Sequence, residues 1–340
     1  MSGRHPTLPV AELRASLEAE RYAYNLGEKQ GRVILVEVDP QGALLATRRS
    51  GFVNYSLQLI FQCPMTELDI LYAMNDVDYH HWLIKGTGFG VKLTRVQREH
   101  RRLDVEELQR KIGSQIWRAM KGKVHVNLEV PDTLFLGLIT TKRFYFGVYI
   151  ASRNRREFSY RRSPRRPFFN PDTIHPKIAR AMVNLSHSAS GDLFLDPFCG
   201  TGGLLLEAAS IGSIPIGVDN DHRILWGCRS NLNHFKTLFF GIHADTRTLP
   251  FRSQSVDAIA TDPPYGRSSS TRKSDIATLL KTSLTQLADV IHTNKYVCFA
   301  IPLEFFDEGI IDSKEYAIIE EHSVYVHRSL TRHIVVLKRK

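Results

Sequence analysis

The chain has 340 residues, 43% of them hydrophobic, which supports more than one packed domain and argues against extensive disorder. Lysine and arginine outnumber aspartate and glutamate by 45 to 35, and the formal charge of +10 favours a polyanionic partner, although many basic proteins have none. The four cysteines lack zinc-site spacing and no apolar run approaches about 20 residues, so we expect no metal site, no membrane span and a reducing, cytoplasmic location.

The first half of the chain has the pattern of mixed α and β structure. Apolar side chains recur at helical spacing over residues 9–20, and further runs predict strands at 32–38 and 56–62. The pattern restarts near residue 66, with helices expected at 67–74 and 105–120, and strands at 88–94, 124–130, 134–140 and 143–150. We therefore expect one domain over residues 1–65 and a second over residues 66–150.

Residues 151–167 differ sharply in composition and are expected to form a basic linker. Two aromatic residues, Phe158 and Tyr160, and a single acid, Glu157, lie among seven arginines. These are Arg153, Arg155, Arg156, Arg161, Arg162, Arg165 and Arg166. A solvated hinge is one interpretation. A strip that binds phosphates and stacks bases is the other, and the density of arginine favours it.

From residue 168 to the end, strands and helices alternate, which predicts a mostly parallel, doubly wound sheet. The expected strands are 193–195, 215–218, 239–243, 256–261 and 296–301, and the expected helices are 203–210, 224–235 and 276–291. Two extended runs at 316–326 and 333–338 are joined by a short turn, so we expect an antiparallel hairpin at the edge of the sheet.

A glycine-rich turn follows the first expected strand of this half. Gly200 and Gly202 allow the backbone to approach a ligand closely, and the first N–H groups of the next helix are available to it. Such a turn is weak evidence alone, because a dinucleotide site or a simple tight turn has the same pattern. The candidate cofactor-binding residues here are Asp196, Pro197, Phe198, Gly200, Thr201 and Gly202.

Acids also follow the second and third expected strands. Asp219 is a candidate for binding two ribose hydroxyls, because a carboxylate at this position does so in nucleoside-binding α/β sheets. Asp221 is the alternative for the ribose, and Asn220 between the two acids is also a candidate cofactor-binding residue, although Asn220 and Asp221 both suit the cap of the following helix. Asp245, with Thr246, is the candidate for binding an adenine ring and its amino group.

The fourth expected strand is followed by Asp262-Pro263-Pro264-Tyr265-Gly266. The prolines fix their own φ and restrict the residues before them, so the Asp262 carboxylate and the Pro263 carbonyl are held in fixed directions. Two acceptors that face one amino group can bind both of its protons and direct its lone pair toward an electrophile. Tyr265 can stack on a base. Asp262, Pro263, Pro264 and Tyr265 are therefore the candidate catalytic residues.

The C-terminal half resembles the class I S-adenosylmethionine-dependent methyltransferases, and D-P-P-Y resembles the catalytic loop of members that methylate exocyclic amino groups of bases. Segments 166–169, 175–185, 196–203 and 327–332 are similar to those of archaeal tRNA guanine-10 N2-methyltransferases. Residues 66–157 resemble a THUMP domain, an RNA-binding module, and residues 1–65 resemble the ferredoxin-like segment that precedes it. Asn220 departs from the family pattern, in which a hydrophobic residue is commoner, so the choice between Asp219 and Asp221 stays open.

The resemblance implies an α/β, Rossmann-like class I methyltransferase domain preceded by α+β ferredoxin-like and THUMP domains. It implies S-adenosyl-L-methionine as cofactor, tRNA as partner, and transfer of one and then a second methyl group to guanosine N2, with position 10 as the expected target. The alternatives are a THUMP-type guanine-6 enzyme, a DNA amino-methyltransferase and a non-catalytic RNA-binding protein. Eukaryotic relatives work with a small activating protein subunit, while the catalytic chain itself is expected to be a monomer.

Overall fold

The computed structural model describes residues 1, 5–96, 103–170, 173–264, 273–306, 309–327 and 330–340, and it divides into two compact units. Unit 1 comprises Asn25–Thr47 and Asn54–Ser152 together with Met1. Unit 2 comprises Ser2–Tyr24, Arg48–Val53 and Arg153–Lys340. The expected boundary at residue 65 differs from this division, because the first helix and Arg48–Val53 belong with the C-terminal half.

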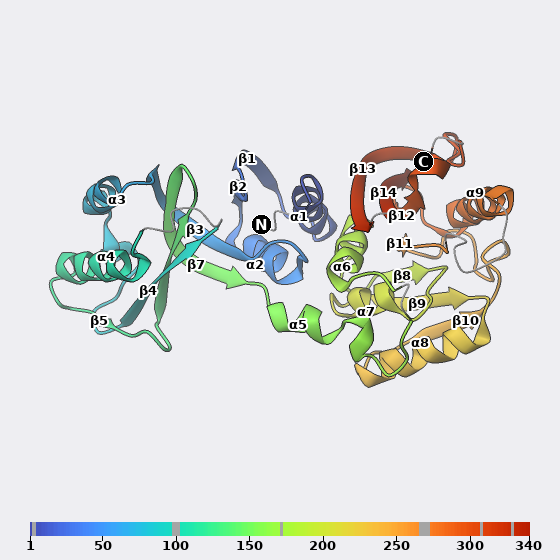
Figure 1. The fold of residues 1–340 in the computed structure, drawn as a ribbon, viewed down its shortest axis with the longest axis horizontal. Coiled ribbons are helices and arrows are strands. Elements are labelled where there is room, and N and C mark those ends of the chain that lie inside the picture. Colours follow the sequence, from blue (N-terminus) through green and yellow to red (C-terminus); the bar gives the residue numbers. More distant parts are fainter. Residues whose placement is uncertain (2–4, 97–102, 171–172, 265–272, 307–308, 328–329) are drawn as a thin grey trace. The chain divides into compact units, whose positions relative to one another are not determined.

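Unit 1 contains a five-stranded sheet in the order β3-β7-β6-β4-β5, and β1 and β2 form a separate two-stranded sheet (Figure 1). β4 is parallel to β5 and β6, whereas β7 is antiparallel to β3 and β6. From residue 24 to residue 152 the helices and strands are β1 (Tyr24–Gln30), β2 (Val33–Val38), α2 (Pro40–Arg49), β3 (Tyr55–Pro64), α3 (Glu67–Ala73), β4 (Gly88–Arg95), α4 (Val105–Ala119), β5 (His125–Val126), β6 (Thr133–Ile139) and β7 (Arg143–Ser152).

The core of unit 1 lies between its larger sheet and α4. The Asp104 carboxylate accepts hydrogen bonds from the first N–H groups of α4 and so fixes where the helix begins. Leu108, Ile112 and Ile116 recur at helical spacing and are fully buried, in a cluster that also contains Phe135 of β6. Burial of this apolar face stabilises α4 on the sheet.

Three features of unit 1 depart from the expected elements. The strand predicted at 124–130 is wrong over most of its length, since β5 ends at Val126. The side chain of Asn127 accepts hydrogen bonds from the backbone N–H groups of Glu129 and Val130 and closes a turn there. β1 and α2 have no counterpart among the expected elements.

Unit 2 contains a seven-stranded sheet in the order β10-β9-β8-β11-β12-β14-β13. The first five strands in this order are parallel, and β14 and β13 form an antiparallel hairpin at one edge, as expected from the sequence. The elements are α1 (Leu8–Ala19), α5 (Arg155–Tyr160), α6 (Pro176–Leu185), β8 (Leu193–Asp196), α7 (Gly203–Ala209), β9 (Ile214–Asp219), α8 (His222–His234), β10 (Phe240–His243), β11 (Ala258–Thr261), α9 (Lys273–Val290), β12 (Tyr296–Pro302), α10 (Leu303–Phe306), β13 (Tyr316–His327) and β14 (Leu330–Arg339).

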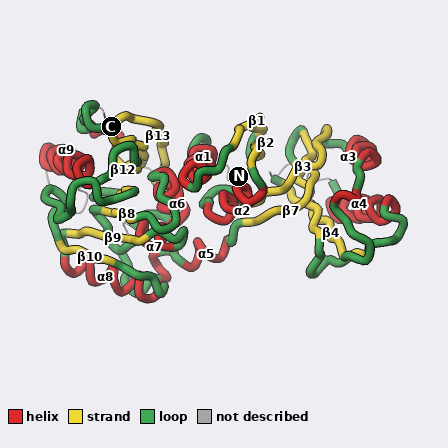
Figure 2. The backbone as a smooth tube through the Cα atoms, turned by 180° about the vertical axis from the view of Figure 1, so that it is seen from behind, coloured by secondary structure: helices red, strands yellow, loops and turns green. Residues whose placement is uncertain are grey.

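Helices cover both faces of this sheet, and the two faces have separate cores (Figures 1 and 2). Phe194 of β8 packs in the cluster that includes residues of α1, α6, α7 and α8, while the next residue, Leu195, packs in the cluster that includes residues of α9. β9 pairs with one side of β8, and β11, which comes later in the chain, pairs with the other side. In open α/β sheets, ligands bind at the carboxyl ends of strands beside such a change of direction.

α1 contributes Leu8, Ala11 and Ala15 to the first of these cores, together with Ile178 and Met182 of α6. This shared core is the physical reason why the first helix belongs to unit 2. Throughout the described ranges, every helix is too short or too polar to cross a bilayer.

Candidate active site

The glycine turn between β8 and α7 has a backbone that only glycine adopts readily. Gly200 and Gly202 have φ values of 50° and 83°. A Cβ atom on Gly202 would lie 2.5 Å from Leu232 Cδ1 and 2.8 Å from Cys228 Sγ, both on α8. The turn is therefore tightly packed against α8.

Asp196 ends β8 and is almost completely buried, with 1% of its surface exposed. Its Oδ1 atom accepts hydrogen bonds from the Thr261 hydroxyl at 2.7 Å and from the Phe198 N–H at 3.2 Å. Burial raises the pKa of Asp196 to about 7, the two hydrogen bonds oppose this, and the charges of Asp262 and Asp219 add to it. Burial is the main cause, and the smaller contributions of Asp262 and Asp219 place three carboxylates near one another at this edge.

Asp219 ends β9 and belongs to the same edge. Its Oδ2 accepts a hydrogen bond from the Gly200 N–H at 3.0 Å, so the second acid is joined directly to the glycine turn. Burial is the main reason why the pKa of Asp219 is raised. The Asp221 carboxylate instead accepts from the N–H groups of Arg223 and Ile224 and caps α8.

The remaining candidates of this region lie near the edge strand β10. Asn220 is exposed, and its backbone carbonyl lies 3.0 Å from His243 Nε2. The side chain of Asp245 forms an ion pair with Arg247, which lowers the pKa of Asp245. Thr246 is buried, and its hydroxyl accepts a hydrogen bond from Ser283 of α9 at 3.1 Å.

Asp262 directly follows β11, where the sequence predicts the amino-binding loop. Its two carboxylate oxygens lie 3.1 and 2.9 Å from Arg332 Nε, on β14. Pro263 is buried and Pro264 is exposed. Tyr265 lies outside the described residues, so its stacking role remains a prediction.

The arginine strip expected to bind RNA does not form one exposed surface. Arg153, Arg161 and Arg166 are buried, with 5–7% of their surfaces exposed, and the expectation that these three contact phosphates is wrong. Arg156, Arg162 and Arg165 are exposed, while the side chain of Arg155 lies outside what the structure describes.

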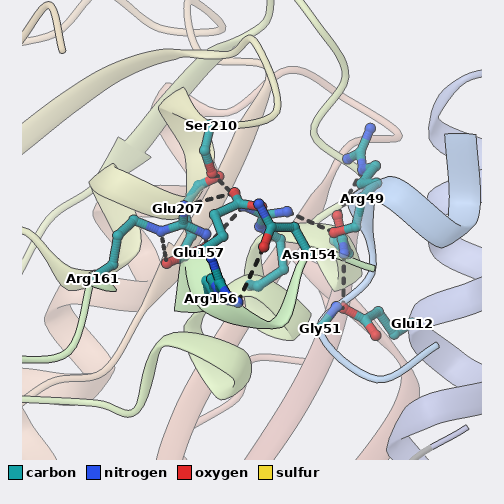
Figure 3. A network of polar contacts seen from close by, with 11 residues as sticks. Glu12, Arg49, Gly51, Asn154, Arg156, Glu157, Arg161, Glu207 and Ser210 are labelled. Atoms are coloured by element: carbon teal, nitrogen blue, oxygen red, sulfur yellow. Dashed lines mark hydrogen bonds and ion pairs between the residues drawn. The ribbon is translucent and has the colours of Figure 1, made fainter. Parts of the chain in front are cut away.

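Arg161 is buried because an acid of α7 binds it (Figure 3). Its Nε and Nη2 atoms lie 2.8 and 2.9 Å from the two carboxylate oxygens of Glu207, which is itself fully buried. Arg180 of α6 contacts the same carboxylate at 2.9 Å, and Arg161 also pairs with Glu157 at 2.6 Å. These contacts hold α5, α6 and α7 together behind the glycine turn.

The same network continues into the N-terminal segments of unit 2 (Figure 3). Arg180 donates to the backbone carbonyl of Arg49 at 2.7 Å. Glu12 of α1 accepts from the Gly51 N–H at 2.7 Å and from the Asn184 side chain at 2.9 Å. Sequence reasoning missed these residues, because each partner lies far away along the chain.

Comparison with known proteins agrees with this geometry. The model of the RMKL-like methyltransferase domain family, UPF0020, matches residues 163–334. The tRNA (guanine(10)-N2)-dimethyltransferase of Methanothermobacter thermautotrophicus is 34% identical over 340 residues, covering 100% of this chain and 98% of the relative. The enzyme of the same name from Methanocaldococcus jannaschii is 31% identical over 367 residues, with the same coverage.

The chain belongs to the tRNA (guanine(10)-N2)-dimethyltransferase family. Solved structures show that the fold is shared more widely. TrmN from Thermus thermophilus matches with a TM-score of 0.53 and 20% identity over 100% of this chain and 98% of its own. SMU.472, a methyltransferase solved with S-adenosylhomocysteine, matches with a TM-score of 0.55 and 13% identity over 100% and 97%. The fold of unit 2 is therefore that of a class I methyltransferase.

The protein is an S-adenosyl-L-methionine-dependent methyltransferase, and its residues fit this cofactor. The Gly202 backbone packs so closely against α8 that no side chain fits at this position of the turn. Asp196, Asp219 and Asp245 follow three neighbouring strands and offer hydrogen-bond acceptors to hydroxyl and amino groups.

Proposed function

We propose that this protein methylates N2 of guanosine 10 in tRNA, first once and then a second time. The observation that carries the proposal is the position of Asp262, at the end of the strand next to β8 and its cofactor turn. Membership of a family named for guanine(10)-N2 dimethylation supports this target and does not favour guanine-6 or DNA methylation. The carboxylates at the strand ends are intact, which argues against a non-catalytic RNA-binding protein.

The cofactor, when bound, supplies an electrophilic methyl group on sulfur. In our proposal Asp219 binds its ribose hydroxyls, since this acid contacts the glycine turn while Asp221 caps a helix. Asp245 and Thr246 bind the adenine end. The turn 196–202, with Pro197, Phe198, Gly200 and Thr201, surrounds the remaining part of the cofactor.

Asp262 and the backbone carbonyl of Pro263 accept the two protons of the guanine amino group. This orients the nitrogen lone pair toward the methyl group, so that transfer depends on position and hydrogen bonding and requires no nucleophilic side chain. The nitrogen–carbon bond forms as the bond from that carbon to sulfur breaks, and the proton that the nitrogen then loses passes to the Asp262 carboxylate or to water. The base must leave its stack to reach this loop. Tyr265 stacks on the extruded base in this proposal.

The proposal assigns RNA binding to the N-terminal region, with residues 66–150 as a THUMP domain and residues 1–65 supplying a ferredoxin-like segment. The sheet of unit 1 with α3 and α4 is compatible with an α+β module of this kind. Arg156, Arg162 and Arg165 are the exposed arginines that we assign to phosphate contacts. The proposed enzyme is cytoplasmic and its catalytic chain monomeric.

The test is mass spectrometry of nucleosides from tRNA treated with the pure chain and cofactor. We expect N2-methylguanosine to appear first and N2,N2-dimethylguanosine later, and both to disappear in a tRNA that carries adenosine at position 10. Product that survives this change but is lost when guanosine 6 is replaced would identify the other tRNA enzyme. Methylated duplex DNA would contradict the tRNA assignment.

The same assay tests the small activating subunit. Activity of the chain alone would show that such a subunit is dispensable. Inactivity of a folded chain that binds S-adenosylhomocysteine would show that a partner is required.

A further inference from the structure

Arg332 and Asp262 form a buried ion pair beside the cofactor turn. The Nε atom of Arg332 lies 2.9 Å from one carboxylate oxygen of Asp262 and 3.1 Å from the other. Both side chains are only 10% exposed. The N–H of Arg332 is therefore shared between the two oxygens and restrains the position of the carboxylate.

The two residues come from strands that are not neighbours in the sheet. Asp262 follows β11, Arg332 lies on β14, and β12 runs between these strands. Arg332 pairs in register with Pro302, the last residue of β12, so its side chain crosses the carboxyl end of that strand to reach Asp262. Because Arg332 lies on a paired strand of the sheet, its contact with Asp262 restrains the loop that begins at Asp262.

The surroundings of Asp262 are rich in negative charge. Asp196 of β8 has a raised pKa, to which the charges of Asp262 and Asp219 contribute. Arg332 places a positive charge beside this group of carboxylates. The pair is not explained by stability alone, since desolvation of two buried charges offsets most of their attraction. A functional reason for Arg332 follows from the chemistry of Asp262.

Both oxygens of a carboxylate can accept hydrogen bonds. Displacement of the Asp262 carboxylate would take its oxygens away from the amino protons. Asp262 therefore has to be held in place, and Arg332, which contacts both oxygens, restrains it.

We propose that Arg332 is a positioning residue for methyl transfer, which holds the Asp262 carboxylate in place beside the amino group of the base. This inference rests on the proposed function of Asp262. It assigns a role to the segment 327–332, which resembles the family but lies outside the cofactor turn and the D-P-P-Y loop. In this role Arg332 acts through Asp262 and does not contribute to cofactor or tRNA affinity.

The test is a double-mutant cycle on the full-length protein, with single-turnover transfer of radiolabelled methyl groups to tRNA. We expect R332Q to slow transfer by about 100-fold, and R332K by about 10-fold, because lysine restores the charge on a more flexible side chain that restrains the carboxylate less. D262N should slow transfer further, to a rate that incubation over hours still measures. In the D262N background, R332Q should cost less than about 3-fold, since Arg332 then has no carboxylate to position.

Binding measurements separate positioning from folding. S-adenosylhomocysteine affinity by calorimetry and tRNA affinity by filter binding should stay within about 3-fold of wild type in R332Q and R332K. The matched control is R339K, the same substitution near the other end of β14, where the Arg339 side chain contacts Ala288 and Glu315. We expect R339K to transfer methyl groups at the wild-type rate.

Four outcomes would overturn the role of Arg332. These are an unchanged rate in R332Q, a faster rate, an equal slowing in both backgrounds, or a loss of S-adenosylhomocysteine affinity as large as the loss of rate. A faster rate would mean that the ion pair blocks the site instead of preparing it. Wild-type activity of D262N is a separate result, because it would overturn the proposed function of Asp262 itself.

Discussion

Thr261 donates its hydroxyl proton to Asp196 Oδ1 at 2.7 Å, and this buried hydrogen bond joins the end of β11 to the end of β8. Asp196 begins the glycine turn, and Thr261 immediately precedes Asp262. The cofactor turn and the amino-binding loop therefore share one contact inside the sheet. Methyl transfer needs the two reacting atoms at a fixed separation, and a contact of this kind limits how far the loops can drift apart.

Replacement of Asp262 by alanine should abolish methylation and leave tRNA affinity nearly intact. The change removes an acceptor for the amino protons, and we expect transfer to slow by at least about 100-fold. Methyl incorporation and filter binding on the same preparation measure the two effects. Near wild-type activity would show that another residue orients the amino group.

The raised pKa of Asp196 predicts how stability depends on pH. The ordinary pKa of 3.8 applies to the unfolded chain, and the folded value is about 7, so the folded state holds the proton more tightly. This group therefore costs stability progressively as pH rises from about 4 to about 7, and the full cost persists above pH 7. Asp196→Asn should raise the free energy of unfolding at pH 8 by about 1 to 3 kcal/mol and change it little at pH 4. Denaturant melts at the two pH values measure this difference, and an equal gain at both would contradict the cause.

The same ionisation should govern cofactor affinity. A negative Asp196 attracts the cationic cofactor, so affinity for S-adenosylmethionine should increase by up to about 10-fold between pH 6 and pH 8. In Asp196→Asn the affinity should be lower at pH 8 and should lose this component of the pH dependence. Calorimetric titration at several pH values measures both effects. A variant with the wild-type pH profile would assign the titration to another group.

Gly202→Ala should destabilise the cofactor turn. The new Cβ would approach Leu232 and Cys228 within 2.8 Å, at a backbone φ of 83° that alanine adopts only under strain. We expect a loss of about 2 kcal/mol or more in unfolding free energy and weaker S-adenosylhomocysteine binding. The matched control is Gly113→Ala within α4, where no atom lies within 4 Å of the new methyl group. That change should be neutral or stabilise by up to about 1 kcal/mol.

Removal of a partner from the buried network should destabilise the fold without affecting exposed RNA contacts. Arg161→Met leaves Glu207, which is fully buried, with one cation fewer, and we expect a loss of about 3 kcal/mol in unfolding free energy. Arg156→Met changes an exposed side chain of the same linker and should leave stability within about 0.5 kcal/mol. It should instead weaken tRNA binding, more at low salt than at high salt. Thermal melts and salt-dependent binding distinguish the two arginines.

The sheet of the C-terminal half was predictable from sequence because buried parallel strands are short apolar runs that end in glycines and acids. β8, β9 and β11 each end at or just before an acid of the candidate site, and these acids lie at the same edge. This agreement follows from topology alone, since parallel strands place their carboxyl ends together. The expectations for Asp196, Asp219 and Asp262 needed no knowledge of contacts between distant residues.

The contacts that escaped prediction depend on partners far away along the chain. The composition of residues 151–167 predicts that Arg161 is exposed, yet Arg161 binds Glu207, which lies 46 residues later, and is buried. Arg332 has its partner 70 residues earlier. The sequence gives the position of each arginine, but it does not show whether water, phosphate or a buried carboxylate surrounds the side chain.

The order in which unit 2 is assembled along the chain has a consequence during protein synthesis. α1 leaves the ribosome before its core partners Ile178 and Met182, which follow only after unit 1 has been made. Unit 1 can fold while translation continues, whereas the apolar face of α1 stays unpacked until α6 has been made. A fragment that starts at residue 153 lacks α1 and Glu12 and leaves that face of α6 exposed. The core of unit 2 therefore forms only when α1 and α6 are both present, and products that lack either helix should be prone to aggregation.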